Sequence, residues 1–410
     1  MTRVATTPLV TARTSALTRA KLLRELSRKS RDYGVTPFNP LGFRCVAKAL
    51  WNTATPWRVL NWTGYAVAIG AFEAALRVGQ RLDDVLFPEW RDQPIDEPVF
   101  IIGNPRSGTT MLHRLVSMDE ATFAPLTLAH SFFPAVTIRK AISAAARLDE
   151  KIPFHPGRRL VDAINAIFFS GWDGIHQMGI DKAEEDEAIF LLAFNTVNFS
   201  LMAPDMESLM PLAKSDEDDV NYQRRFMEYY EAQMRRHLYA DGKNRRYINK
   251  NVFMVGRLER LDERFPDAKY VYLVRHPYEA IPSFLSMWWE KWVSDDAEFP
   301  KDGRDTRLLA ELAVYYYHRA LELMDRIGPE RFMVVDYRKL VADPRGTVRR
   351  IYDFLGVEIR PEVNQMLEEA TRHQRDYESR HEYSLEDFGL SEDWVYERLE
   401  PLFERFGFPR

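Results

Sequence analysis

The stretch FIIGNPRSGTTMLHRL, residues 100–115, contains most of a Walker A phosphate-binding loop. Gly103 and Gly108 give its G-x-x-x-x-G frame. Thr109 replaces the motif lysine that reaches the terminal phosphates of a nucleoside triphosphate, and Arg106 supplies a positive charge three residues earlier. A glycine-framed turn that leads into a helix binds anions through backbone N–H groups and the helix dipole. The stretch therefore predicts an anion-binding loop, with poor support for transfer of a terminal phosphoryl group.

Short apolar runs alternate with helical patterns around this loop. Strands are expected at residues 98–103, 247–250, 269–274 and 331–336. Helices are expected from Thr109 onward, at 255–265, from Asp343 to Gly356 and from Ser391 to Gly407. Strands that alternate with helices form a parallel sheet covered on both faces. The predicted fold class is therefore α/β, with a P-loop-like parallel sheet flanked by helices.

The composition is that of an ordinary soluble protein. The chain has 410 residues, of which 46% are apolar and 29% are charged, with a net charge of -5. This charge argues against a general nucleic-acid binder. Cys45 is the only cysteine, which excludes an internal disulfide and a cysteine-based zinc site and fits a reducing, cytoplasmic compartment. No metal site is assigned.

The N-terminal part differs from the rest. Residues 1–31 carry eight Lys or Arg and one acid, which fits a transit-like peptide, a basic arm that contacts anionic lipid, or a solvated tail. The fourteen residues 59–72 contain no charge, and Trp51, Trp57 and Trp62 lie nearby. These residues fit a helix in a membrane interface, giving a weak peripheral contact, or a buried core helix, which is the favoured interpretation.

A second anion site is predicted in VRHPYEAIPSF, residues 274–284. Arg275 ends a buried strand, and Ser283 follows it by eight residues in the next helix. Both side chains can reach one phosphate at the carboxyl edge of the sheet, where open α/β sheets bind ligands. Pairing of Arg275 with a surface acid is the alternative.

These two motifs resemble those of the sulfotransferases that use 3′-phosphoadenosine-5′-phosphosulfate (PAPS). FIIGNPRSGTTML resembles their 5′-phosphosulfate loop, and VRHPYEAIPSF their 3′-phosphate motif, with Arg and Ser at the same spacing. The resemblance covers roughly residues 97–408 and is greatest to bacterial-type members that act on small molecules, lipids or carbohydrates. It implies metal-independent transfer of a sulfuryl group from PAPS to an acceptor hydroxyl, with release of PAP.

The resemblance also assigns residues. The donor-binding set is Pro105, Arg106, Ser107, Gly108, Thr109 and Thr110 at the 5′ group, with Arg275 and Ser283 at the 3′-phosphate. Arg106 stands where many relatives have lysine, and it and Lys250 are expected to offset charge on the leaving bridge oxygen. The proline that usually follows the family lysine is replaced by Asn251 and Val252, so the target of Lys250 stays open.

The general base is expected among three candidates. His176 and Glu185 match a His plus Glu-Glu pattern of the family, and His130 is a rival. The acids at 184–187 also fit the N-terminal cap of the apolar helix that follows them.

The pattern of helices and strands also predicts how the chain is organised. Residues 1–95 are expected to be a helical extension and 96–410 the sulfotransferase domain, with 120–246 a helical insertion on the substrate side that shows no clear strand. Apolar residues within 122–200 favour a lipid-like alcohol over a sugar as acceptor, although they would equally serve to pack helices. A P-loop kinase or nucleotide hydrolase, and a non-catalytic nucleotide-binding module, are the alternative functions.

Overall fold

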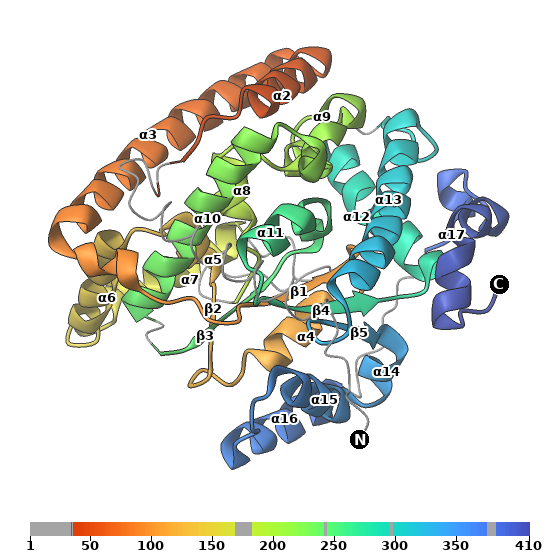
Figure 1. Cartoon of the computed structure of the whole chain (residues 1–410). Coiled ribbons are helices and arrows are strands. Elements are labelled where there is room, and N and C mark those ends of the chain that lie inside the picture. The colour runs from red at the N-terminus through yellow and green to blue at the C-terminus, as the bar shows by residue number, and fades with distance from the viewer. Residues whose placement is uncertain (1–33, 35, 169–182, 242–243, 296–297, 375–382) are drawn as a thin grey trace, which may run out of the picture.

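The computed structural model describes residue 34 and residues 36–168, 183–241, 244–295, 298–374 and 383–410. Within them five parallel strands form one sheet in the order β2-β3-β1-β4-β5 (Figure 1). The strands are β1 Val99–Gly103, β2 Phe123–Pro125, β3 Arg246–Lys250, β4 Lys269–Val274 and β5 Phe332–Asp336. The predicted α/β class with a parallel sheet is confirmed.

The central strand β1 and its neighbour β4 are buried on both faces, as their continuous apolar sequences predict. In β1, Val99 and Ile101 pack into one hydrophobic core, whereas Phe100 and Ile102 pack into the other. Register pairs Ile101 with Lys250 in β3 and with Val271 in β4. Alternation of side chains across the strand therefore divides the core into two layers.

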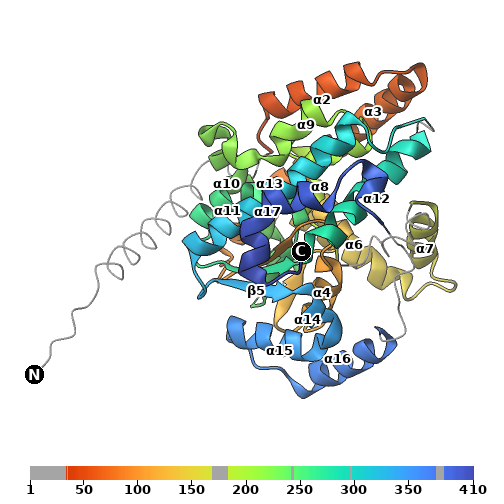
Figure 2. The ribbon, with the colours of Figure 1, turned by 90° about the vertical axis from the view of Figure 1, so that its right-hand side faces the viewer.

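Helices cover both faces of the sheet, as Figures 1 and 2 show. Below the sheet in Figure 1 lie α4 Thr109–Val116, α14 Tyr337–Ala342, α15 Pro344–Leu355 and α16 Pro361–Gln374. Above it lie α8 Glu187–Leu192, α9 Met206–Ala213, α10 Val220–Asp241, α11 Leu258–Arg264, α12 Pro277–Asp295 and α13 Arg304–Ile327, with α17 Glu392–Phe406 packed against α13. The remaining helices are α2 Pro40–Asn52, α3 Pro56–Leu86, α5 Leu128–Phe132, α6 Val136–Asp149 and α7 Pro156–Phe168.

Helix ends follow the capping chemistry of the sequence. Asp343 accepts a hydrogen bond from the Gly346 N–H at 2.8 Å and so caps α15, which ends at Gly356 in the left-handed conformation. Ser391 caps α17 through the Trp394 N–H at 3.1 Å. Both predicted helices are confirmed.

Two expectations about the N-terminal half are wrong. The short strand β2 pairs with β3 inside the stretch where no strand was expected, because three residues are too few to produce a periodic pattern. The apolar segment 59–72 forms part of α3 and is not a core helix, since only 6% of the most apolar 18-residue window of α3 is buried. By length and composition alone, α3 is long and apolar enough to cross a membrane. Residues 1–31 lie outside the described residues, and the proposed domain boundaries remain predictions.

The sheet has a topological switch point between β1 and β4. The chain leaves β1 toward β2 on one side, whereas it leaves β4 toward β5 on the other. Ligands of open α/β sheets bind in the crevice outside the carboxyl ends of such neighbouring strands. The loop before α4 and the residues that follow β4 both start at this point.

Candidate active site

The loop between β1 and α4 is a tight turn held by its neighbours. Arg106 and Gly108 have positive φ angles of 65° and 88°. A Cβ atom on Gly108 would lie 2.7 Å from the ring of Tyr337, so glycine is needed there for both conformation and space. Asn104 Nδ2 donates to the carbonyl of Ala313 at 2.9 Å and fixes the start of the loop. The loop is therefore shaped before any ligand binds.

The donor set of this loop fits an anion. Ser107 is fully buried, and its hydroxyl has no hydrogen-bond partner within the part of the chain that the structure describes. The first N–H groups of α4 have no intrahelical partner, and no described side chain caps this helix. A buried hydroxyl without a partner costs free energy, which a bound oxygen of phosphate or sulfate would recover. Pro105 to Thr110 therefore form a loop whose donors suit a bound anion.

The second motif lies directly against this loop. The Arg275 guanidinium donates from Nη1 to the Arg106 carbonyl at 3.0 Å. The Arg106 guanidinium donates from Nε to Ser283 Oγ at 3.2 Å. The structure thus brings together three residues that the sequence separates by up to 177 positions. Arg275 also pairs with the exposed Glu279 at 2.9 Å, so the surface-acid contact that was its alternative is present as well.

Lys250 reaches the loop from the end of β3. Its Nζ donates to Thr110 Oγ1 at 3.0 Å and to Glu185 Oε1 at 2.6 Å. The Lys250 side chain is 2% exposed and that of Glu185 is 23% exposed. A buried ammonium, a hydroxyl of α4 and a partly exposed carboxylate therefore meet at one point beside the loop.

The three acids directly before α8 have three different environments. Glu184 is buried and pairs with Arg114 at 3.4 Å, and Glu185 pairs with Lys250. Asp186 occupies the N-cap position of α8, but its side chain makes no capping hydrogen bond with the described residues. The acids thus lie at the start of α8, as the helix-cap interpretation expects, but the Asp186 side chain turns toward Tyr230 and not toward the helix N–H groups.

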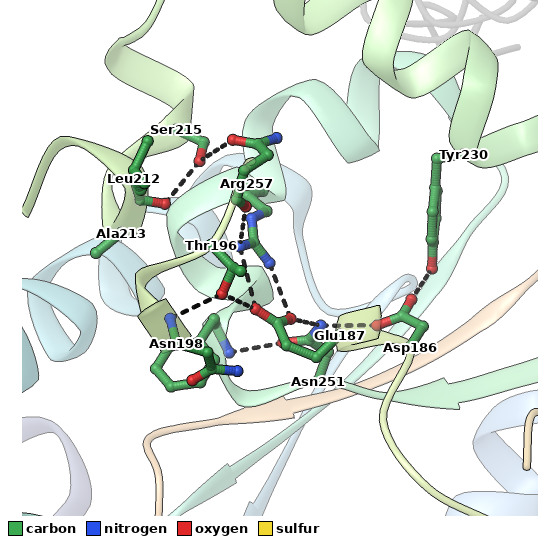
Figure 3. Close-up of polar contacts among 12 residues, drawn as sticks. Asp186, Glu187, Thr196, Asn198, Leu212, Ala213, Ser215, Tyr230, Asn251 and Arg257 are labelled. Atoms are coloured by element: carbon green, nitrogen blue, oxygen red, sulfur yellow. Dashed lines mark hydrogen bonds and ion pairs between the residues drawn. The ribbon is translucent and has the colours of Figure 1, made fainter. Parts of the chain in front are cut away.

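A buried polar network fixes Asp186 and Glu187 beside the end of β3 (Figure 3). Asn251 donates from Nδ2 to Asp186 Oδ1 at 2.7 Å and to Glu187 Oε2 at 2.6 Å. Its Oδ1 accepts from the Phe253 N–H at 2.8 Å and caps the short 3-10 helix η5 Val252–Arg257. Asn251 thus fixes the chain after Lys250, at the place where the expected proline is missing.

Arg257 completes the network. Its guanidinium donates to both carboxylate oxygens of Glu187, at 3.3 and 3.4 Å, and to the Asn195 carbonyl at 2.6 Å. Burial raises the pKa of Asp186 to about 6, although the hydrogen bonds from Tyr230 and Asn251 oppose the shift. The network holds Asp186 and Glu187 directly after Glu185, whose own carboxylate pairs with Lys250.

Of the two histidine candidates, the structure describes only His130. His176 lies outside the described residues. His130 Nδ1 accepts from the Thr127 N–H at 3.4 Å in a capping box at the start of α5. Burial, together with Arg139 and Arg245, lowers the pKa of His130 to about 3, which is far too low for an efficient general base near neutral pH.

Three residues at the site were not predicted from the sequence. Tyr337 packs against Gly108, and its ring lies 4.6 Å from the Arg275 guanidinium. Arg257 and Tyr230 belong to the buried network. An aromatic residue directly after β5 and an arginine inside the apolar run VFMVGRL were the available signals.

Comparisons with known proteins place this geometry in a family. The model of the sulfotransferase family matches residues 98–361, well over half of the chain. Sulfotransferase STF9 from Mycobacterium avium has a similar structure, with a TM-score of 0.69 and 21% identity over 100% of this chain and 99% of that one. STF1 from Mycobacterium tuberculosis H37Rv gives a TM-score of 0.65 at 23% identity over 93% and 98% of the two chains. At this identity the two structures support the fold.

A curated relative supports the same family at the level of sequence. Omega-hydroxy-beta-dihydromenaquinone-9 sulfotransferase Stf3 of Mycobacterium tuberculosis (strain CDC 1551 / Oshkosh) is 24% identical over 272 residues, which are 64% of this chain. The match spans 63% of the length of that relative, slightly less than two thirds. The family match covers the loop before α4, Lys250, Arg275 and Ser283. The chain belongs to the sulfotransferase family.

Proposed function

We propose that the chain transfers a sulfuryl group from PAPS to the hydroxyl of a small-molecule or lipid acceptor and releases PAP. The observation that carries this proposal is the contact of Arg106 with both Arg275 and Ser283. It joins the two motifs into one anion-binding edge at the switch point between β1 and β4. A nucleotide with anionic groups at both its 5′ and 3′ positions matches two adjacent anion sites.

The proposed donor site uses backbone and side-chain donors together. Pro105 to Thr110 would surround the 5′-phosphosulfate, with the Ser107 hydroxyl as one buried donor. Arg275 and Ser283 would bind the 3′-phosphate, because a guanidinium forms strong charge-assisted hydrogen bonds to phosphate. Arg275 would exchange its exposed partner Glu279 for this phosphate.

In the proposed reaction, the acceptor oxygen forms a bond to sulfur while the bond from sulfur to the bridging oxygen of PAPS breaks. Negative charge then develops on that bridging oxygen, and Lys250 and Arg106 are the cations at the loop that would stabilise it. The acceptor hydroxyl gives its proton to a base. Glu185 is our first candidate, because its partly exposed carboxylate lies 2.6 Å from Lys250 Nζ. His176 is the second.

A lipid acceptor is favoured over a sugar. The curated relative is named for a hydroxylated menaquinone, a lipid-like acceptor.

The buried Cys45 is the only cysteine of the chain and supports a reducing, cytoplasmic location.

A thermal-shift experiment tests the nucleotide preference. PAP and PAPS should raise the melting temperature without metal, whereas ATP with magnesium should not, because ligands stabilise only the folded state that binds them. Stabilisation by ATP with magnesium alone would favour a kinase or hydrolase. Stabilisation by PAP without turnover of PAPS on lipid, phenolic and carbohydrate alcohols would leave a non-catalytic binding module.

A further inference from the structure

The outer side of α3 is apolar along its whole length. Residues at spacings of three or four along the helix are exposed there and carry no charge. This outer stripe consists of Trp57, Leu60, Gly64, Val67, Ala71, Ala75, Val78, Leu82 and Val85. Exposure reaches 68% for Trp57, 69% for Val67 and 76% for Val85. The stripe is roughly 42 Å long at the rise of an α-helix. It is a continuous apolar surface, whereas ordinary protein surfaces carry single, scattered apolar residues.

The inner side of the same helix is anchored to the domain. Leu76 and Gly79 are buried against α6. Asp83 accepts from the Val136 N–H at 2.9 Å and pairs with Arg236 at 3.2 Å, both in the interior. The inner side of α3 therefore packs through both apolar and polar residues, Leu76 with Ile69 and Phe72 and the buried Gln80 and Asp83, whereas the apolar stripe faces outward and packs against nothing in the described residues. Figures 1 and 2 both show α3 along the outside of the molecule.

Contacts near both ends of α3 indicate whether this helix could span a membrane or lie on its surface. Before α3, Asn52 Nδ2 donates to Asp205 Oδ2 at 2.8 Å and ties α2 to α9. After its midpoint, Gln80 Nε2 donates to Gln233 Oε1 at 3.2 Å on α10. A helix attached to one domain at both ends cannot cross a bilayer without breaking these contacts. It can lie in the interface, with its outer side at the boundary between headgroups and acyl chains.

The charges around this helix are complementary to anionic lipid. Between residues 36 and 72 the sequence contains Arg44, Lys48 and Arg58 and no acid, although the chain carries a net charge of -5. Arg44 and Lys48 are exposed on α2, next to α3. Exposed Trp51 and Trp57 lie where the two helices meet, and tryptophan favours the headgroup level of a bilayer. The segment thus combines an apolar stripe, interfacial aromatics and a local positive charge.

We propose that the outer stripe of α3 docks on the surface of an anionic lipid bilayer and holds the enzyme there. The docking surface itself is independent of the donor nucleotide. The further consequence, that acceptors reach the site from the lipid phase, rests on the proposed transfer to a lipid hydroxyl.

Co-sedimentation of the full chain with vesicles tests the docking. The vesicles contain phosphatidylcholine alone or phosphatidylcholine with phosphatidylglycerol. We expect binding to the anionic vesicles and partial release by salt, because surface attraction is screened within about 10 Å at 0.1 M salt. The variant Leu60→Glu/Val67→Glu should bind about tenfold or more weakly, since a charge on an inserted face opposes insertion.

A matched control separates docking from misfolding. Val341 and Met366 are similarly exposed, at 52% and 45%, on helices at the opposite end of the molecule from α3 (Figure 1). The control variant Val341→Glu/Met366→Glu should bind vesicles like the unchanged protein. All three proteins should have the same melting temperature and bind PAP equally, so failure of the PAP measurement would count against the proposed function and not against docking.

Three results would overturn the proposal. The full chain could stay in the supernatant with anionic vesicles at low salt. The stripe variant and the control variant could bind equally. The unchanged protein could form a dimer that Leu60→Glu/Val67→Glu converts to a monomer, and the occupant of the stripe would then be a second copy of the chain.

Discussion

Replacement of Lys250 by methionine removes the ammonium beside the loop and keeps most of the length of the side chain. In the structure this ammonium contacts Glu185 at 2.6 Å and Thr110 at 3.0 Å. If Lys250 stabilises charge that develops on the bridging oxygen of PAPS, its effect appears in the transition state and not in the ground state. The variant should therefore lose kcat and keep the KM for PAPS.

The expected losses of stability and of kcat can both be estimated from the burial of this ion pair. Breaking a buried ion pair typically costs about 3–5 kcal/mol, because one charge stays buried without its partner. Here the remaining partner, Glu185, is 23% exposed, so water can solvate it and we expect a smaller loss of unfolding free energy, about 1–3 kcal/mol. Loss of one donor to a developing oxyanion typically lowers kcat by about 10²–10³.

Steady-state kinetics with varied PAPS and a saturating acceptor measures this prediction. Calorimetric titration with PAP reports whether the donor site is intact, and urea unfolding reports stability. In the double variant Lys250→Met/Glu185→Gln we expect stability to recover, because no unpaired carboxylate remains, while kcat stays low. A kcat within about tenfold of the unchanged enzyme, with a raised KM for PAPS, would reduce Lys250 to an ordinary binding residue. Recovery of kcat in the double variant would show that Lys250 only neutralises Glu185 and that Glu185 is not the general base.

Three further predictions follow from other contacts. Arg275→Ala should weaken PAP by about 1.5–3 kcal/mol in calorimetry but leave adenosine 5′-phosphosulfate, which lacks the 3′-phosphate, nearly unchanged. Glu279→Ala, which removes only the exposed partner of Arg275, should not weaken PAP, and equal losses for both nucleotides would make Arg275 structural. Gly108→Ala should lower the melting temperature and PAP affinity, because a Cβ there would lie 2.7 Å from Tyr337 at a positive φ of 88°. The control Gly64→Ala meets no atom within 4 Å and should keep both, and a tolerated Gly108→Ala would refute the tight loop. The pKa of Asp186 is about 6 in the folded state and about 4 in the unfolded chain. The free energy of unfolding should therefore fall by up to about 3 kcal/mol as pH rises from about 4 to about 6, because the folded state loses a proton that it binds more tightly than the unfolded chain does. Asp186→Asn should abolish that fall in urea unfolding at pH 4.5 and pH 7, and identical pH dependence in the two proteins would contradict it.

Much of the fold was predictable because its signals are local. The strands around the loop are continuous apolar runs, and helices α15 and α17 begin at capping residues and end at glycines. Strand β2 has three residues and forms through pairing with β3, so no window of sequence contains its signal. The exposure of α3 was also hidden, because an apolar helix has the same sequence whether its surroundings are protein or lipid.

The site shows the same division. The loop and the Arg275–Ser283 pair could be identified from spacing, since each lies within one short motif. The contact of Lys250 with Glu185 could not, because it depends on how the segment before α8 folds against β3. The buried network explains this folding, and its members are scattered from residue 186 to residue 257. Polar residues that act only through tertiary contacts leave no periodic pattern.

Mass spectrometry of a reaction with PAPS and a hydroxylated lipid tests the central proposal most directly. Sulfuryl transfer predicts equal amounts of PAP and sulfated lipid, formed without added metal. It also predicts that Arg275→Ala and Lys250→Met slow the formation of both products together. Phosphorylated lipid from ATP with magnesium, or PAP binding with no sulfated product from any alcohol tested, would contradict it.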